Sequence, residues 1–495
     1  MNAPLRAFLA GLCLAAALAA CKTPPANIDP VVVKVTALAP INRLDPFFED
    51  LQKRTFNFFW ETAEPGTGLV PDRWPNPPFA SIAASGFALN SYAIGAERGW
   101  VTRAEARTRV LTTLKFLWSL PQGPEADSTA GYHGFFYHFL NFKTGLRYGG
   151  SELSTVDTAL FMAGVLFVGG YFDGDHPDEV AIRKLAEDLY SRVNWPWTIE
   201  HVPDIRMGWS PEKQFKFHDW RGYNEGMIVY VLALGSPTHP AAPGTWVSFT
   251  SNYYQHWGTI EGLTHLTFGP MFGHQYSAIW IDYRGIKDEF MWPQGIDYFE
   301  NSRRATLAQR AYAIRNPMDW RGYGPNIWGL TACDGPGDYK LPYLGQTRQF
   351  RSYSARGVSL DPEETFDDGT IAPTAAIASL PFAPEIVVPA AREMHKRYGS
   401  HIYGKYGFVD AFNPSFEYDN VPLRHGKRVR GMGWVASDYL GIDQGAIVAM
   451  IENYRSELIW SVMRRNPYVR NGLQRAGFEG GWLDRPAEQP SSAPH

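Results

Sequence analysis

Acidic side chains stand at the starts of several apolar stretches of this sequence. Glu225 precedes the run "GMIVYVLALG", and Asp157 and Asp443 begin the runs "DTALFMAG" and "DQGAIVAM". An acid in the first turn of a helix is favoured by the unpaired backbone N–H groups and by the helix dipole. A carboxyl group beside apolar side chains can instead stay protonated near neutral pH, because burial disfavours its charged form. Such a group can donate a proton, so these acids are candidates for acid–base chemistry.

Two of these acids have a simple structural explanation. Ser154 and Asp157 match the S-x-x-D capping box before an apolar run, so helix capping is the default function of Asp157. Asp443 is likewise a natural N-cap residue. Glu152 and Asp438 lie outside these caps, and helix formation leaves both unexplained. Glu152 and Asp157 are therefore predicted to bind substrate if they do not serve the fold alone.

Glu225 and Asp410 are the strongest candidates for catalysis. Glu225 has no capping function that requires Glu, and Asp410, in "YGFVDAFNPS", has no apolar helical run directly behind it. Hydrolysis of a glycosidic bond needs one protonated carboxyl group and one ionised carboxylate. Apolar neighbours such as Met227 raise a carboxyl pKa, whereas polar neighbours such as Asn413 keep a carboxylate ionised. These surroundings predict Glu225 as the acid and Asp410 as the base.

A third group of candidates lies in "FGHQYSAIWIDYRGIKDEFMW", where hydrogen-bonding and stacking side chains alternate as a polyhydroxylated ligand prefers. Together with the residue two before Glu225, the predicted substrate-binding residues here are Tyr223, His274, Gln275, Tyr276, Trp280, Asp282 and Arg284. His274 and Asp282 could instead bind a metal, but no HxH, HExxH or DxDxDG arrangement accompanies them. We predict neither a metal nor a cofactor.

The composition favours a carbohydrate ligand and argues against nucleic acid. Aromatic residues make up 15% of the chain, with 17 Trp and 25 Tyr, and exposed rings stack on the faces of sugars. Most of these rings are expected in the core of a large helical protein. The formal net charge of -4 and the absence of a basic run make nucleic acid an unexpected partner.

The first residues indicate export. Arg6 is followed by an apolar stretch, 7–20, that is short and rich in Ala, as in a secretory signal. The tetrad "LAAC" resembles a bacterial lipobox, in which Cys21 becomes the lipidated first residue. We expect a signal peptide at 1–20, lipidated Cys21 with a flexible spacer at 21–43, and an exported lipoprotein at the periplasmic side or cell surface, with the outer membrane favoured. Cys13 lies in the signal, so Cys333 is left without a partner for a structural disulfide.

The body alternates two kinds of helical segment, separated by loops with Gly and Pro. Some segments, such as 159–170 and 226–235, are apolar nearly all round, and others, such as 102–111 and 179–193, are amphipathic. An inner ring of buried helices wrapped by an outer amphipathic ring produces this alternation. We therefore predict an all-α fold, an (α/α)6 toroid in which loops before the inner helices gather at one end.

The motifs "SELSTVDTAL", "GYNEGMIVYVLALGSPTHP", "HQYSAIWIDYRGI", "DYFENSRRAT", "DDGTIAPTAA", "YGFVDAFNP" and "GIDQGAIVAMIENYRS", in this order, resemble the bacterial glycoamylase-like family. That family includes the endo-β-1,2-glucanases of glycoside hydrolase family 144. The resemblance implies an exported (α/α)6 enzyme that cleaves β-1,2-glucan with inversion and releases sophorose and short oligosaccharides. It places the catalytic domain at 44–483, followed by a disordered tail at 484–495.

The resemblance also implies functions for individual acids. The general acid of the family is a Glu on an inner helix, which corresponds to Glu225 in "GYNEG". The base is an Asp later in the chain, which corresponds to Asp410, with Asp443 as the alternative. Two other functions stay open: a surface lipoprotein that binds glycan without cleaving it, and a glucoamylase-like exo-enzyme acting on another glucan. We expect a monomer.

Overall fold

The computed structural model describes residues 44–77, 79–200 and 203–486. The predicted signal peptide (1–20), Cys21 with its spacer (21–43) and residues 487–495 of the predicted tail lie outside these ranges. Within them, no helix is long and apolar enough to cross a membrane.

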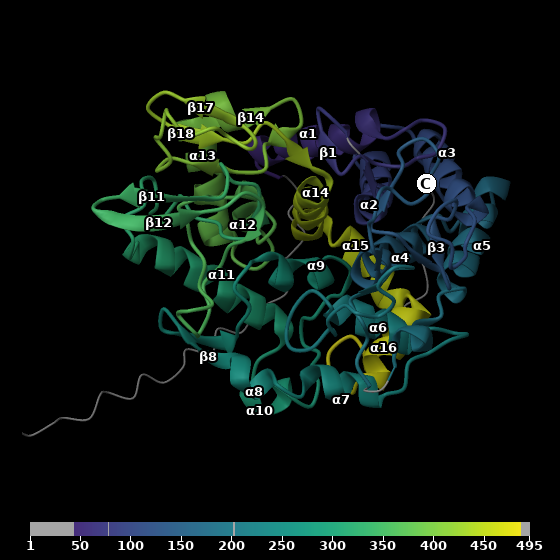
Figure 1. Ribbon diagram of the computed structural model, residues 1–495. Helices are drawn as coiled ribbons and strands as arrows, with labels where there is room; N and C mark the ends of the chain where they lie inside the picture. The colour runs from purple at the N-terminus through teal and green to yellow at the C-terminus, as the bar shows by residue number, and fades with distance from the viewer. Residues whose placement is uncertain (1–43, 78, 201–202, 487–495) are drawn as a thin grey trace, which may run out of the picture. The chain divides into compact units, whose positions relative to one another are not determined.

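Six buried helices form a ring, and each contacts the next around it (Figure 1). In ring order they are α2 (Ile82–Glu97), α4 (Thr155–Tyr171), α6 (Met227–Gly235), α9 (Phe272–Trp280), α12 (Pro373–Ile377) and α14 (Gly441–Ser456). The ring closes between α14 and α2. The contact between α9 and α12 includes a hydrogen bond from the Gln275 amide to the Ala375 carbonyl, 2.8 Å long.

Small residues let the inner helices approach one another closely. At the crossing of α2 and α4, a Cβ added to Gly164 would lie 2.3 Å from the carbonyl oxygen of Gly86. No side chain fits in such a space, so glycine is required there. These helices are buried on nearly every side, which explains why their sequences are apolar all round.

Each inner helix packs against one outer helix on the side that faces away from the ring centre. The outer helices, in the order of their partners α2, α4, α6, α9, α12 and α14, are α3 (Arg103–Ser119), α5 (Pro177–Ser191), α16 (Pro467–Arg475), α11 (Tyr298–Arg315), α13 (Pro384–Ile402) and α1 (Pro46–Thr62). The start of α3 is a capping box in which the Thr102 side chain accepts the Glu105 N–H and Glu105 reaches back to the Thr102 N–H. Six inner and six outer helices confirm the predicted (α/α)6 fold.

Short helices and strands fill the loops between these pairs. The remaining helices are η1 (Trp195–Thr198), α7 (Gly244–Thr250), α8 (Tyr253–His256), α10 (Met291–Gln294) and α15 (Leu458–Arg465). The strands are β1 (Arg73–Trp74), β2 (Ala80–Ser81), β3 (Gly131–Tyr132), β4 (Phe135–Phe136), β5 (Phe139–Leu140), β6 (Leu153–Ser154), β7 (Gly208–Trp209), β8 (Trp257–Ile260), β9 (Leu263–Leu266), β10 (Ala332–Cys333), β11 (Tyr339–Tyr343), β12 (Gln346–Phe350), β13 (Ser354–Ala355), β14 (Tyr403–Gly404), β15 (Gly407–Phe408), β16 (Phe412–Asn413), β17 (Lys427–Val429), β18 (Gly433–Val435) and β19 (Tyr439–Leu440).

These strands form antiparallel ladders of two or three strands at the ends of the helices. Three inner helices start directly after a strand: α2 follows β2, α4 follows β6 and α14 follows β19. The pairing of β1 with β19 brings Arg73 opposite Leu440, one residue before α14 begins. The ladders therefore hold the loops at the N-terminal ends of the inner helices, where the candidate acids lie.

Candidate active site

Glu225 lies directly before α6, whose N-cap is Gly226. The turn is fixed by Ser277 of α9, whose hydroxyl donates to the Glu225 carbonyl (3.1 Å) and accepts the Ile228 N–H (3.1 Å). The side chain is partly exposed, yet its Oε2 is buried and has no hydrogen-bond partner in the described ranges. Burial, with a smaller contribution from the charge of Asp157, raises the pKa of Glu225 to about 7. The carboxyl group can therefore carry a proton near neutral pH.

His138 joins the two acids at the start of α4. Its Nδ1 lies 2.9 Å from Glu152 Oε1, and its Nε2 lies 3.5 Å from Asp157 Oδ1. Burial alone would lower the pKa of His138, but the charge of Asp157 and the hydrogen bond to Glu152 outweigh it and raise the pKa to about 9. Ser154 also caps α4 by accepting the Asp157 N–H, as the capping box predicts. Asp157 thus serves both the helix and the ionic group.

Asp410 and Asp443 lie beside each other, so that one carboxyl group can donate a hydrogen bond to the other when it is protonated. Asp410 precedes β16, and its Oδ2 accepts the Asp334 N–H at 2.7 Å, whereas Asp443 lies in the first turn of α14. Burial and the charge of Asp334 raise the pKa of Asp410 to about 7. Burial and the charge of Asp410 raise the pKa of Asp443 well above its usual range. Asp443 can therefore hold a proton and donate it in a hydrogen bond to Asp410, whereas the Asp334 N–H makes Asp410 the better placed of the two to carry the negative charge.

Arg73 is the cation beside this pair. Its Nη1 lies 3.0 Å from Asp334 Oδ2 and 3.1 Å from Asp438 Oδ2, and its Nε lies 3.5 Å from Asp72 Oδ2. Burial raises the pKa of Asp72, and Arg73 opposes that shift. The positive charge of Arg73 also favours the ionised form of Asp410. Several carboxyl groups thus share one guanidinium group at this end of the ring.

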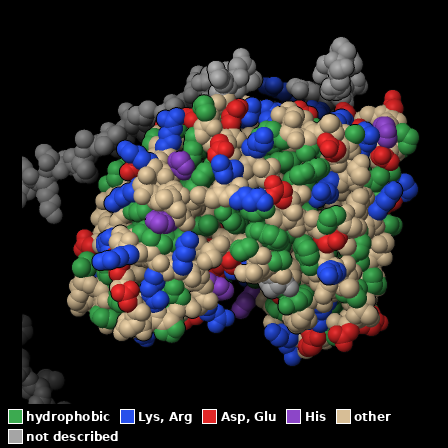
Figure 2. Space-filling model, turned by 90° about the horizontal axis from the view of Figure 1, so that it is seen from above, with side chains coloured by type: hydrophobic (Ala, Val, Ile, Leu, Met, Phe, Trp, Pro, Cys, Tyr) green, Lys and Arg blue, Asp and Glu red, His purple; other side chains and the backbone are tan. Residues whose placement is uncertain are grey.

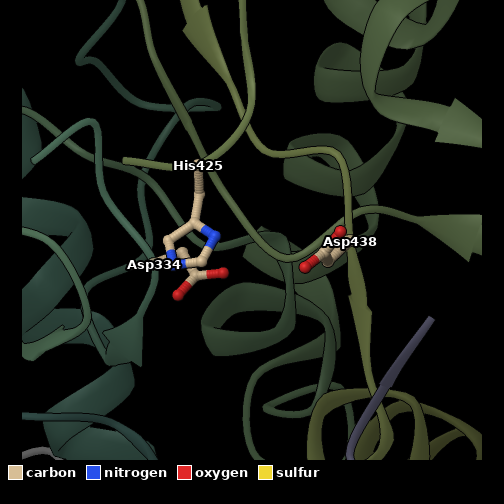
Figure 3. A group of neighbouring side chains, drawn as sticks. All are labelled: Asp334, His425 and Asp438. Atoms are coloured by element: carbon tan, nitrogen blue, oxygen red, sulfur yellow. The ribbon is translucent and has the colours of Figure 1, made fainter. Parts of the chain in front are cut away.

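Asp334, His425 and Asp438 form a group that could hold a metal ion. One ligand atom from each lies within 4.8 Å of the others, and the His425 ring faces Asp334 with Asp438 across from both (Figure 3). Arg73 already neutralises one oxygen of each carboxylate. A cation here would compete with that guanidinium group, so we assign the trio no metal-binding function.

Tyr276 of α9 lies between the two groups of acids. Its side chain is 8% exposed. Burial raises the pKa of its phenol, and the charges of Asp443, Glu225 and Asp157 raise it further. The charges of these three carboxyl groups thus act on one hydroxyl group, although the carboxyl groups come from α14, the turn before α6, and α4. The surface is hollowed at one edge, with histidine side chains in the hollow (Figure 2).

The other members of the predicted substrate-binding cluster have partners inside the protein. Burial lowers the pKa of His274 to about 3, so its ring is neutral: Nε2–H donates to the Phe268 carbonyl (3.1 Å), and Nδ1 accepts the Tyr223 hydroxyl (3.0 Å). The Gln275 amide donates to the Ala375 carbonyl and to Ser379 Oγ, both at 2.8 Å. Burial and these bonds explain His274, Tyr223 and Gln275 as parts of the scaffold.

The last three residues of the cluster lie deeper in the scaffold. The Trp280 indole N–H donates to Asn90 Oδ1 at 3.1 Å, and Trp280 is fully buried. Asp282, 2% exposed, accepts hydrogen bonds from Arg284 (2.7 Å) and from Arg464 (2.6 Å). None of these three side chains is brought to the acids, so the geometry gives the substrate-binding prediction no support for Trp280, Asp282 and Arg284.

Several residues of the site have no clear sequence signal. The five that the structure adds to the predicted acids are Asp72, Arg73, His138, Asp334 and Tyr353. Asp334 stands in "TACDGPGDY", which reads as an ordinary turn, and Asp438 is a residue that helix capping left unexplained. Asp72, His138 and Asp334 share one weak signal, because each is an ionisable side chain in a loop without a helix to cap.

The Glycoamylase family model matches residues 217–467. An exo-β-1,2-glucooligosaccharide sophorohydrolase (non-reducing end) of Parabacteroides distasonis is 30% identical over 459 residues, which cover 86% of this chain and 57% of the relative. The chain thus spans little more than half the length of this curated relative.

Solved structures with similar sequences have the same fold. An endo-β-1,2-glucanase from Chitinophaga pinensis, in complex with sophorotriose and glucose, is 29% identical with a TM-score of 0.74, covering 89% of this chain and 100% of that one. A β-1,2-glucanase from Parabacteroides distasonis is 28% identical with a TM-score of 0.73, covering 87% of this chain and 59% of that one. An endo-β-1,2-glucanase from Talaromyces funiculosus, 11% identical with a TM-score of 0.59, shares the fold.

Proposed function

We propose that this chain, which belongs to the Glycoamylase family, is a glycoside hydrolase acting on β-1,2-glucan. The observation that carries this proposal is the three acids with raised pKa values at one end of the helix ring: Glu225, Asp410 and Asp443. Perturbed carboxyl groups of this kind gather at catalytic sites. The linkage is proposed from the relatives, which are a sophorohydrolase and β-1,2-glucanases.

Glu225 is the proposed general acid. It holds a proton near neutral pH because the side chain is largely removed from water and its buried Oε2 has no partner in the described part of the chain. Protonation of the glycosidic oxygen lets the leaving sugar depart without a negative charge. The proton then returns to Glu225 from water before the next turnover.

Asp410 is the proposed general base, and Asp443 supports it. The Asp334 N–H and the proton on Asp443 both stabilise the negative charge of Asp410, and Arg73 adds a positive charge nearby. Asp410 can then accept a proton from the attacking water. Attack by water on the face opposite the leaving group inverts the anomeric centre, which in such enzymes goes with carboxyl groups about 6.5–9.5 Å apart. Asp443 remains the alternative base.

The proposal is tested by incubating the full-length protein with linear β-1,2-glucan, soluble starch and laminarin, followed by chromatography of the products. We expect sophorose-series sugars from β-1,2-glucan and nothing from the others. Early NMR spectra of the products give the anomer first released, which tests inversion. Intermediate oligosaccharides indicate endo cleavage, whereas sophorose alone indicates exo cleavage.

The same experiment decides between this function and its rivals. Binding of β-1,2-glucan without products favours a glycan-binding lipoprotein, and products from starch favour a glucoamylase-like exo-enzyme. Either result would overturn the proposed substrate or the proposed chemistry.

We further propose that the protein is exported and anchored by a lipid on Cys21. The support is the sequence "LAAC" behind a short apolar segment that follows Arg6. The acyl chains would hold the enzyme at a membrane surface. Incorporation of labelled palmitate into the wild-type chain, and its loss in Cys21→Ser, tests the anchor.

A further inference from the structure

Tyr353 is an exposed aromatic residue beside the carboxyl groups of the site. It follows β12 and directly precedes β13 (Ser354–Ala355), which pairs with β10 so that Ser354 lies opposite Cys333. The ladder ends there, and the next residues of the two segments are Tyr353 and Asp334, whose N–H binds Asp410. The strand pairing therefore places Tyr353 at the proposed base.

The Tyr353 ring is available to a ligand. It is 49% exposed, although burial and the charges of Asp443 and Asp410 raise the pKa of its phenol. A ring that is open to water and close to these carboxyl groups can contact a ligand that reaches them. In the described ranges its hydroxyl makes no hydrogen bond and its ring stacks on no other ring.

A fully buried arginine holds the loop that carries this ring. Arg356 is 0% exposed, and its Nη2 donates to the carbonyl oxygens of Arg351 (3.1 Å) and Ser352 (3.2 Å). Its Nη1 donates to the carbonyl oxygens of Ser354 (3.0 Å) and Cys333 (2.7 Å). The carbonyl groups on both sides of Tyr353 are thus tied to one guanidinium group.

Asp368 pairs with Arg356, and we call this pair, with the hydrogen bonds that hold the loop around Tyr353, the clamp. Asp368 is buried and pairs with Arg356 through both oxygens, at 2.8 and 2.9 Å, and it also accepts the Arg351 N–H at 3.1 Å. The opposite segment packs directly against the clamp, because a Cβ on Gly335 would lie 2.1 Å from the Arg351 carbonyl oxygen. The bidentate pair restricts the loop to one arrangement, so the exposed ring is held in place.

We propose that Tyr353 binds a sugar ring of the glucan beside the base, and that Arg356 is the positioning residue that holds it there. This inference rests on the proposed function, because it assumes a carbohydrate at these carboxyl groups. The C–H face of a pyranose packs on an aromatic ring, and the phenol can hydrogen-bond a sugar hydroxyl. A ring held rigidly before substrate arrives loses little conformational entropy on binding.

Kinetics on linear β-1,2-glucan test the proposal with four variants. For Tyr353→Ala we expect KM to rise about fivefold, with kcat changed by less than about twofold, because an aromatic contact contributes about 1 kcal/mol to binding. Tyr353→Phe should keep most of the affinity, because it retains the ring. Tyr254→Ala is the matched control, since Tyr254 is also an exposed tyrosine, 70% accessible, and lies on α8.

Arg356→Lys tests the clamp. Lysine cannot form the bidentate pair with Asp368, so the loop loosens and KM should rise as in Tyr353→Ala. The Asp334 N–H that stabilises ionised Asp410 should loosen with it, so activity should also require a higher pH. If Arg356→Lys does not fold, the Tyr353 variants alone decide.

The outcomes separate this inference from the proposed function. A wild-type enzyme that cleaves the glucan while Tyr353→Ala keeps a wild-type KM overturns the inference and leaves the function standing. If the wild type cleaves starch instead, the function is wrong, and the same KM comparison on starch decides the inference. If titration shows that the wild type binds none of the three glucans, both proposals fail.

Discussion

The two groups of acids reach similar pKa values in different ways. Glu225 stands almost alone: burial raises its pKa to about 7, and Asp157 adds a minor contribution. Asp410 lies in a cluster of carboxyl groups that includes Asp443 and Asp334. In this cluster, burial raises the pKa values and the like charges raise them further. A raised pKa therefore does not by itself identify an acid or a base.

The surroundings of each group decide which form it uses. Glu225 has no cation to stabilise its charge among its principal neighbours, so it favours the neutral form. Asp410 has the Asp334 N–H, the proton of Asp443 and the charge of Arg73, all of which stabilise its ionised form. One carboxyl is thus suited to donate a proton and the other to accept one.

The largest expected effect comes from Glu225→Gln. Glutamine keeps the shape of the side chain but cannot donate a proton to the leaving oxygen. We expect kcat on β-1,2-glucan to fall by about 10²–10⁴-fold, the range for loss of a general acid. Steady-state kinetics measure this, with Glu289→Gln, an exposed Glu elsewhere, as the control. Wild-type turnover in Glu225→Gln would show that another group is the acid.

The variants Asp410→Asn and Asp443→Asn show which of these two residues is the general base. If Asp410 is the base, Asp410→Asn should also reduce kcat by about 10²-fold or more. Asp443→Asn should reduce it by less than about tenfold, because its amide can still donate a hydrogen bond to Asp410. Parallel kinetics on both variants decide the assignment. A larger loss of kcat in Asp443→Asn than in Asp410→Asn would show that Asp443 is the base and Asp410 its supporting residue.

The isolation of Glu225 has a cost in stability that can be measured. Its folded pKa of about 7 lies above its ordinary value of 4.5. The penalty is therefore absent below about pH 4.5, grows as the pH rises and is complete above about pH 7. Glu225→Gln removes it, so at pH 8 the variant should be more stable, on the order of 2 kcal/mol. Denaturant unfolding at pH 5 and pH 8 measures this; a difference that does not grow with pH would count against buried, neutral Glu225.

Removal of Arg73 should move one limb of the pH–rate profile and not the other. Without the cation, ionised Asp410 is less favoured, so its pKa rises and activity begins at higher pH, by about one pH unit. The basic limb, which reports the loss of the proton from Glu225, should stay in place. The pH dependence of kcat/KM for Arg73→Gln measures both limbs. Equal movement of both limbs would contradict the separation of the two groups.

His138→Asn should move the basic limb of the pH–rate profile and leave the acid limb in place, the opposite of Arg73→Gln. Of the predicted effects, this shift should be the smallest. His138 is charged at neutral pH and partly neutralises Asp157. Its removal leaves more negative charge near Glu225, so the pKa of Glu225 rises and the basic limb moves to higher pH, by roughly a few tenths of a unit. The acid limb should not change. A shift of the basic limb to lower pH would show that Asp157 does not act on Glu225.

The sequence predicts the helix ring better than it predicts the site. Runs such as 159–170 are apolar all round because α4 is buried on every side, so burial leaves a readable pattern. Asp157 and Asp443 could be found because acids at helix starts stand out. Arg73 and Asp334 could not, because they lie in short strands and turns, and their meeting depends on the pairing of β1 with β19 and on contacts between distant loops.

In the aromatic and polar cluster at 274–284, the sequence predicts ligand-binding residues that the structure places in the scaffold. Residues such as Gln275 and Asp282 have the chemistry of ligand-binding groups, but their partners are the Ala375 carbonyl and Arg284 inside the protein. Most buried polar side chains are hydrogen-bonded, and sequence cannot tell an internal partner from a ligand.

The protonation of Glu225 is the claim on which the account depends most. Infrared difference spectra of wild type minus Glu225→Gln, recorded from pH 4 to pH 9, report this carboxyl group directly. We predict a carboxylic acid band that persists at pH 6 and disappears with a midpoint near pH 7. A carboxylate that is already ionised at pH 6, with a midpoint near the ordinary value of 4.5, would contradict the account.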